Sequence, residues 1–441
     1  MRASVIISAA FFVTAATAHA GTFADSHDQV PPNWRGNVFR LSQDFPASDP
    51  SKADPAPTYP WQQYDFRTQP GQYIKAVYDY VQEGNREVDW VVQNNAVRRW
   101  YHAPWMHYGD KGREFVRGLT RERTTPAPAQ AGKGELGPQQ TLCLQNWAVG
   151  FLNAPGGYVM GKVWANPNDP DPLKALFPEG TVAAKLLFTA APVEQAPYLN
   201  GTLEWDANID QLFAGDPNCR FTGGRKIQKV RLLQMDLAIR DRRANDSTGW
   251  VFATYSYDGS RGGAGWWDRM LPVGVMWGND PKLDQAAFNA GMRVKESWIN
   301  PELKTPQHLG FLGRLNGPVD NPASACMSCH MTAEVPARSP MIPSANNPDL
   351  MRWYANLPAG NSFDQRAIGT DYNLQISTGI QNFQLWKQTA QGGYAAPAPR
   401  PGAAASTQLE SMVAPAAPAP VAAEGSETLM INGAQVYRVD R

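Results

Sequence analysis

The chain has 441 residues, of which 40 are basic and 40 acidic, so its formal net charge is zero. A balanced charge gives no net electrostatic attraction to nucleic acid or to an anionic membrane surface, so neither partner is expected. This length allows one large domain or two smaller ones, and the 38 Gly and 37 Pro residues indicate many turns between short elements.

The first twenty residues have the pattern of a secretory signal peptide. Arg2 gives a positive start, residues 5–13 form an apolar core, and residues 18–20 make an A-x-A-like cleavage site. The apolar stretch is shorter than the roughly 20 residues that span a membrane, and no later segment reaches that length. We therefore expect residues 1–20 to be removed and the mature chain, which begins near Gly21, to be periplasmic or secreted without a membrane span.

The N-terminal part of the mature chain is predicted to be an extended arm followed by helices. Residues 21–60 are rich in Pro, Asp and Ser and lack periodicity, which predicts an arm lying on the body of the protein. A helix is predicted over residues 72–83, with Gly84 as its C-terminal stop. The apolar residues on one face of this helix are Ile74, Val77, Tyr78 and Val81. Residues 87–101 and 113–123 are predicted to be further helices.

Beyond about residue 141 the hydrophobic pattern changes from helical to alternating, which predicts strands. The plainest strand covers residues 180–189, where Lys185 lies on the face opposite a row of apolar side chains. That row comprises Val182, Ala184, Leu186 and Phe188. Residues 230–239 and 250–257 are rich in β-branched, aliphatic or aromatic residues, and a turn-forming segment separates them. These segments predict a central antiparallel sheet.

The sequence Cys326-Met327-Ser328-Cys329-His330 is a C-x-x-C-H motif, which is the attachment site of a c-type haem. At this spacing each thiol can bond one vinyl group of a porphyrin, and the following histidine can bind the iron. We therefore predict one covalent haem c, held by Cys326 and Cys329, with His330 as its metal ligand. Such a cofactor implies redox chemistry outside the cytoplasm.

C-x-x-C pairs also occur in zinc sites and in redox-active sites. A zinc site would take a second Cys/His pair nearby, but the nearest further candidate is the single His308. A redox C-x-x-C pair would open a helix in a βαβ unit, whereas this motif follows the loop-like residues 315–322. Neither requirement is met here, so the motif favours haem attachment over a zinc site or a redox pair.

The sixth position of the iron is left open by the sequence. Met341, between Pro340 and Pro343, is one candidate, and His308 is another; the third possibility is no protein ligand. Met341 more often packs in a core, and His308 is more often a structural histidine. His102 and His107 lie in an aromatic segment, where core packing is the more common role.

Cys143 and Cys219 fit no metal-ligand spacing. In an oxidising compartment they could form a disulfide, which would close a long loop. Two buried free thiols are the alternative, and the sequence does not decide between them.

The C-terminal region changes composition once more. Residues 391–426 are dominated by Ala and Pro, which predicts a disordered, semi-extended linker. Residues 427–441 contain two short apolar runs around the turn pair Asn432-Gly433, which predicts a hairpin. An isolated hairpin is marginally stable, so it would dock on the body of the protein or on a partner.

The predicted fold class is therefore α+β: a helical N-terminal part, a central antiparallel sheet, the haem motif after the sheet, and the Ala/Pro-rich tail. Residues 21–390 are expected to form a single haem-binding domain.

The order of these elements resembles that of sheet-based c-type cytochromes, namely the cytochrome c-prime-beta family and the related hydroxylamine-oxidising cytochromes whose haem is cross-linked to a lysine. The similar segments are residues 177–182 leading into the strand with Lys185, residues 235–241 and 249–252, and the haem motif. The resemblance implies His330 on one side of the iron and an open or weakly occupied position on the other. It also makes Lys185 a candidate cross-linking position, although a lysine on the outer face of a strand is more often only solvated.

Three functions are compatible with these observations. The first is one-electron transfer by an exported single-haem cytochrome, with a redox protein or a small electron donor or acceptor as partner. The second is a haem enzyme or gas-binding protein whose open distal side admits small nitrogen or oxygen species. The third is an adaptor that binds a partner through the linker and terminal hairpin.

Overall fold

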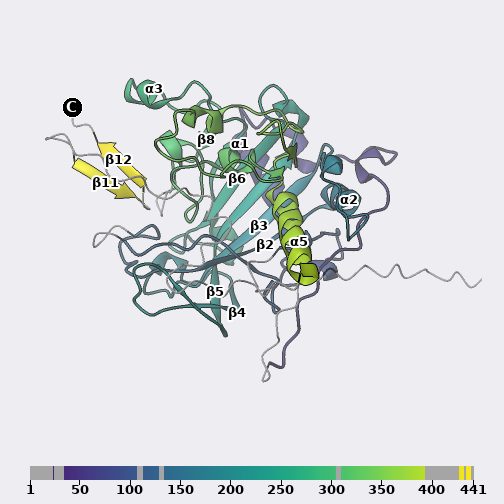
Figure 1. Ribbon diagram of the computed structural model, residues 1–441, viewed down its shortest axis with the longest axis horizontal. Coiled ribbons are helices and arrows are strands. Elements are labelled where there is room, and N and C mark those ends of the chain that lie inside the picture. Colours follow the sequence, from purple (N-terminus) through teal and green to yellow (C-terminus); the bar gives the residue numbers. More distant parts are fainter. Residues whose placement is uncertain are drawn as a thin grey trace, which may run out of the picture.

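A large antiparallel sheet dominates the computed structural model, which describes residues 23, 34–106, 113–128, 134–303, 309–392, 427–431 and 434–438. Its strands follow the order β1-β2-β3-β5-β6-β7-β8, and β4 pairs with the long β5 (Figure 1). The strands of this sheet are β1 Thr120–Arg121, β2 Asn146–Leu152, β3 Val182–Thr189, β4 Glu204–Leu212, β5 Phe221–Arg240, β6 Trp250–Tyr257, β7 Met270–Met276 and β8 Ser297–Ile299. Two small two-stranded sheets pair β9 Glu334–Val335 with β10 Ile368–Gly369, and β11 Glu427–Ile431 with β12 Ala434–Arg438.

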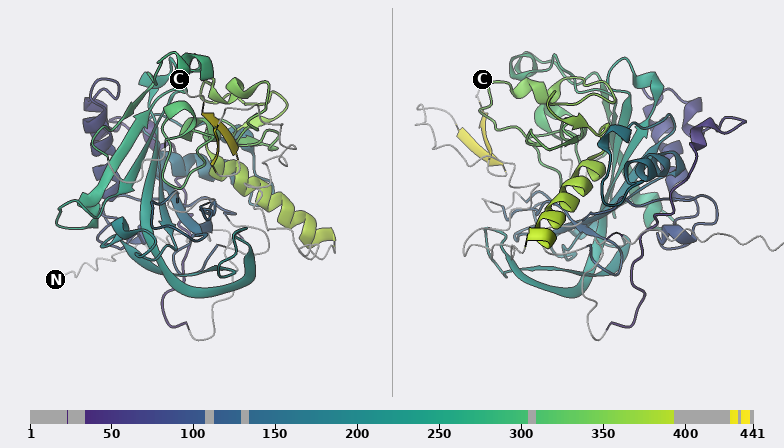
Figure 2. Two further views of the ribbon diagram at one scale, coloured as in Figure 1. Left: turned by 90° about the vertical axis from the view of Figure 1, so that its left-hand side faces the viewer. Right: turned by 45° about the vertical axis from the view of Figure 1, so that its right-hand side comes forward.

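Short helices and 3₁₀ turns surround the sheet. The α-helices are α1 Pro70–Gln82, α2 Ala154–Val163, α3 Gln285–Asn289, α4 Cys326–His330 and α5 Leu374–Gly392. The 3₁₀ turns are Pro50–Lys52, Pro60–Gln63, Val92–Asn94, Pro172–Lys174, Pro197–Leu199, Arg242–Ala244, Trp266–Arg269, Phe311–Gly313 and Leu350–Tyr354. Figure 2 shows that the C-terminal half of α5 projects away from the sheet. The prediction of an α+β chain with a large antiparallel sheet is confirmed.

Alternating residues of β6 send their side chains into two separate cores. Val251, Ala253, Tyr255 and Tyr257 belong to the core that also contains α1. Trp250 and Phe252, from the opposite face, belong to the core that contains α2 and the start of α5. This alternation is the two-residue period of a strand with both faces covered. The sheet therefore separates an α1 side from a side that carries the C-x-x-C-H motif.

Helix α1 confirms the prediction over residues 72–83. Its apolar stripe is fully buried at Ile74, Val77 and Val81, and each such side chain contributes roughly 1.5–3 kcal/mol to folding. The ring of Tyr78 stacks on that of Tyr255, with 4.5 Å between centroids, which ties α1 to β6.

The helix predicted over residues 113–123 is wrong. Glu114 is buried, and its carboxylate accepts the backbone N–H groups of Val116, Arg117 and Leu119. A side chain that captures neighbouring N–H groups competes directly with helical hydrogen bonding. Gly118 then adopts a left-handed φ of 73° close to the ring of Phe39, and the chain enters β1.

The helix predicted over residues 87–101 is also wrong. Asp89 and Trp90 both have positive φ, at 49° and 61°, which no α-helix accommodates. The Asn95 side chain accepts the backbone N–H groups of Val97 and Arg98, so turns replace the helix and only Val92–Asn94 forms a 3₁₀ turn. The N-terminal part is therefore helical only over α1 and the short 3₁₀ turns, because local polar side chains satisfy backbone groups that a helix would use.

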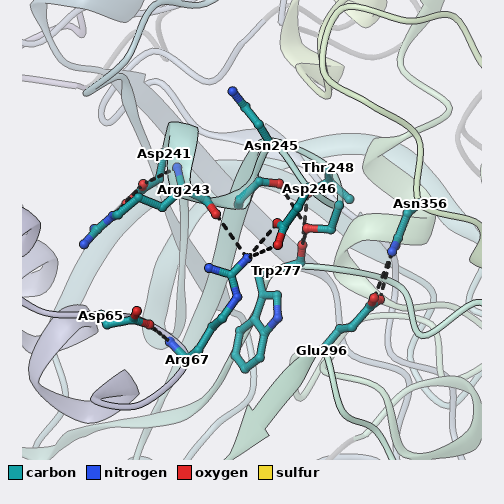
Figure 3. A network of polar contacts seen from close by, with 12 residues as sticks. Asp65, Arg67, Asp241, Arg243, Asn245, Asp246, Thr248, Trp277, Glu296 and Asn356 are labelled. Carbon is teal, nitrogen blue, oxygen red and sulfur yellow. Dashed lines mark hydrogen bonds and ion pairs between the residues drawn. The ribbon is translucent and has the colours of Figure 1, made fainter.

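The predicted extended arm is confirmed over residues 34–60. It contains no α-helix or strand, and it is held to the body by Ser42, whose backbone N–H donates to His102 Nδ1 at 3.0 Å. A second link lies further on, where Arg67 donates to both carboxylate oxygens of Asp246, at 2.6 and 2.9 Å, and to the carbonyl oxygen of Arg243 (Figure 3). The contacts of Arg67 fix the chain before α1 to the turn that joins β5 and β6.

In the region of the predicted C-terminal hairpin, the described residues form the antiparallel pair β11 and β12, in which Ile431 is opposite Ala434. The predicted signal peptide and the Ala/Pro-rich residues 393–426 lie outside the described residues. No helix in the described part of the chain is long and apolar enough to cross a membrane.

Candidate functional site

The C-x-x-C-H residues form the short helix α4, and the loop before it is tightly held. The backbone N–H of Cys326 donates to the carbonyl oxygen of Leu315 at 3.1 Å, and that of Ala325 donates to Ser328 Oγ at 2.7 Å. Upstream, the fully buried guanidinium of Arg314 donates to four backbone carbonyl groups at 2.7 to 3.1 Å. These bonds position both cysteines and His330 on one side of the sheet.

The thiols of Cys326 and Cys329 are not joined to each other. Desolvation and the nearby carboxylate of Asp320 raise the pKa of Cys329 to about 11 and raise that of Cys326 well above its usual value. In redox-active C-x-x-C pairs, by contrast, the pKa of the nucleophilic thiol is lowered. The sheet is also antiparallel rather than built from βαβ units. The redox C-x-x-C reading is therefore disfavoured.

The imidazole of His330 is oriented by a backbone carbonyl. Its Nδ1 lies 2.9 Å from the carbonyl oxygen of Tyr372, and since that oxygen can only accept, Nδ1 carries the proton. Burial lowers the pKa of His330 to about 4, so the ring is neutral at pH 7. Nε2 then keeps its lone pair, which is the tautomer of a histidine that binds a metal. The ring of Phe252 packs beside it, with 4.8 Å between centroids.

His330 lines a cavity of about 130 Å³, open in part to solvent, between the sheet and the start of α5. On the sheet side the cavity is lined by small residues, namely Ala148, Gly150, Ala183 and Ala238, and also by larger ones that include Trp250 and Phe252. The opposite side is formed by residues 372–375 and Thr378.

The residues at this site fit a covalently attached haem. Two thiols that are not disulfide-bonded lie three positions apart on α4, and the neutral His330 ring that follows them borders a partly open cavity with apolar and charged lining residues. When bound, a haem would supply one-electron redox chemistry and a site for small ligands at iron.

Lys185 lies on the cavity side of β3, which corrects the expectation of a merely solvated lysine. Its side chain is 30% exposed, and its ammonium group lies 3.8 Å from Glu122 Oε2 and 3.6 Å from Asp236 Oδ2. Although burial lowers its pKa, the carboxylates of Glu122, Asp236 and Asp320 raise it by more, so the pKa lies above its usual value. An ammonium group is not a nucleophile, so nothing in this arrangement activates Lys185 for cross-linking.

The structure shows which candidates for the sixth ligand of the iron line the cavity and which do not. Met341 is not among the residues that line the cavity, whereas Met106 is. His102 is buried elsewhere as an acceptor for the Ser42 N–H, and burial together with Arg113 lowers its pKa to about 3. His107 and His308 lie outside the described residues. Met106 was missed because no local pattern relates it to a motif more than 200 residues away in sequence.

The described residues contain no group of three or more His, Cys, Asp or Glu side chains that could hold a metal ion. A zinc site would use such a group, whereas a haem takes only one protein ligand from this motif. The zinc alternative therefore lacks its further ligands within the described ranges.

Cys143 and Cys219, which are 76 positions apart in sequence, form a disulfide with an S–S distance of 2.04 Å. The structure therefore has the disulfide rather than two free thiols, a choice that the sequence left open. The bond connects the chain just before β2 to the turn between β4 and β5.

Comparison with known proteins adds no relative, since no protein-family model, no curated protein and no solved structure matches this chain.

Proposed function

We propose that this protein is an exported c-type cytochrome that carries one covalent haem on Cys326 and Cys329 and acts in one-electron transfer. The observation that carries the proposal is the orientation of His330, whose Nδ1 is held by the Tyr372 carbonyl so that Nε2 keeps its lone pair, in a motif whose two thiols are not disulfide-bonded. The disulfide Cys143–Cys219 is compatible with an oxidising compartment. The electron partner is a redox protein or a small donor or acceptor.

A second candidate is a haem protein that acts on small nitrogen or oxygen species. It is favoured by the charged groups of Glu122, Lys185 and Asp236 in the cavity wall, because titratable groups with perturbed pKa values are common where proton transfer occurs. Electron transfer alone would not require them.

The absorption spectrum of the reduced protein, recorded with and without carbon monoxide, separates the two. One-electron transfer predicts a six-coordinate, low-spin spectrum that carbon monoxide leaves unchanged. A five-coordinate, high-spin spectrum that shifts on adding carbon monoxide would instead establish an open distal side and favour small-molecule chemistry.

A further inference from the structure

Three polar side chains form a row across the sheet beneath the C-x-x-C-H motif. Lys185 on β3 is opposite Asp236 on β5, and Asp236 is opposite Thr254 on β6, so all three project to the cavity side. Thr254 Oγ1 donates to Asp236 Oδ1 at 3.0 Å and lies 3.8 Å from Cys326 Sγ. Glu122 extends the row beyond Lys185. The row therefore connects the cavity wall to the thiol that would hold the cofactor.

The two oxygens of Asp236 have different surroundings. Oδ1 accepts hydrogen bonds from Gln234 Nε2, at 2.7 Å, and from Thr254 Oγ1, whereas Oδ2 pairs with the Lys185 ammonium at 3.6 Å. That separation exceeds a hydrogen bond. Oδ2 is therefore the oxygen at which a proton can be accepted without breaking a hydrogen bond.

Negative charge is in excess around Asp236. The charged and titratable groups near it are the Lys185 ammonium, the carboxyl of Asp320 and the thiol of Cys326, and Glu122 pairs with the same Lys185. Asp320 is joined to it through Gln234 Nε2, which donates to both carboxyls. One ammonium group cannot balance three ionised carboxylates, and desolvation makes this arrangement costly. Burial, opposed by Lys185 and aided by Asp320, raises the pKa of Asp236 to about 6.

Protons can reach this carboxyl from solvent. The side chains of Asp236, Glu122 and Lys185 are 24%, 23% and 30% exposed, because they line an open cavity. Adding an electron to a centre beside Cys326 makes the region more negative, which favours protonation of the nearest acid. By linkage, protonation of that acid favours the electron in turn.

We propose that Asp236 is the proton acceptor of the redox centre: each electron delivered by a one-electron donor is accompanied by transfer of a proton from solvent to Asp236 Oδ2. The inference rests on the proposed function. Oxidation returns the proton to solvent, so no other reactant is consumed.

The test is the reduction potential of the purified holoprotein, measured by spectroelectrochemistry from about pH 5 to about pH 9. We expect the potential to fall as pH rises, by up to ~59 mV per pH unit where one proton accompanies one electron. Asp236→Asn should abolish this slope, and Asp236→Glu should retain it. Asp206→Asn is the matched control, since it removes a 56% exposed carboxylate of β4 and should leave the slope unchanged.

Glu122→Gln keeps the test independent of any folding defect in the Asp236 variants. It leaves Lys185 paired with Asp236 alone, which should move the pH-dependent window to lower pH. A flat profile in the wild type, or an unchanged slope in Asp236→Asn, would overturn the inference. A chain that carries no haem on a denaturing gel would contradict the proposed function itself, which the haem stain reveals before any potential is measured.

Discussion

The Nδ1 atom of His330 lies 2.9 Å from the carbonyl oxygen of Tyr372, the residue two positions before α5. This contact joins the motif helix to the segment that covers the cavity from the other side. Because the acceptor is a backbone carbonyl, the orientation of the imidazole depends on the fold rather than on a single replaceable side chain. The same contact fixes which ring nitrogen can bind iron.

Replacing His330 with Ala should change the spin state and the reduction potential of any holoprotein that still carries haem, because the proximal ligand sets the ligand field. Absorption spectroscopy and potentiometry measure both quantities. His102→Asn is the matched control, since His102 is buried away from the cavity, and it should leave the spectrum as it is. A His330→Ala holoprotein with the wild-type spectrum and potential would show that another residue binds the iron.

Removing the disulfide should destabilise the protein without affecting the haem site. A bond between residues 76 apart contributes roughly 4–5 kcal/mol in the chain-entropy model. We expect the double variant Cys143→Ser, Cys219→Ser to lose stability of this order in denaturant unfolding while its absorption spectrum stays that of the wild type. Adding a reductant should lower the stability of the wild type and leave the variant unaffected. Equal stability of the two proteins without reductant would refute the pairing in solution.

Acid should destabilise the protein partly through His102. Burial, with a smaller effect from Arg113, lowers the pKa of His102 from 6.5 to about 3. Between these values the unfolded chain binds a proton that the folded chain excludes, so the free energy of unfolding falls as pH falls from about 6.5 toward 3, by up to about 1.4 kcal/mol per pH unit. His102→Asn, whose amide oxygen can still accept the Ser42 N–H, should show a shallower pH dependence over this window. If the free energy of unfolding fell equally with pH in the wild type and in His102→Asn, this assignment would be contradicted.

Strands β3 and β6 and the second half of β5 were predictable because their signal is local, whereas the other strands of the sheet were not predicted. In β3 the apolar residues alternate along the strand and belong to the core that contains α1. In β6 the nearly continuous apolar run matches a strand with both faces covered. The turn between β5 and β6 is marked by residues that favour turns. The helices predicted over residues 87–101 and 113–123 do not form because side chains, above all those of Glu114 and Asn95, accept backbone N–H groups there. Helical periodicity does not reveal such competition.

The site was predictable only where its residues are adjacent in sequence. Cys326, Cys329 and His330 form one motif, but Met106, Glu122 and Asp236 come from distant segments that the sheet brings together. Lys185 shows the limit most clearly, since a lone charged residue on one face of a strand has the same pattern whether that face meets water or a cavity.

Covalent haem attachment is tested most directly by the intact mass of the denatured protein, purified from the periplasm of a host with the attachment machinery. We predict that the wild-type chain is heavier than the mature polypeptide by one haem and gives a haem-stained band on a denaturing gel. The double variant Cys326→Ala, Cys329→Ala should lack both, while Cys143→Ser, Cys219→Ser should keep both. A wild-type chain with the mass of the bare polypeptide and no haem stain, or haem retained covalently by the Cys326→Ala, Cys329→Ala variant, would contradict the proposed function.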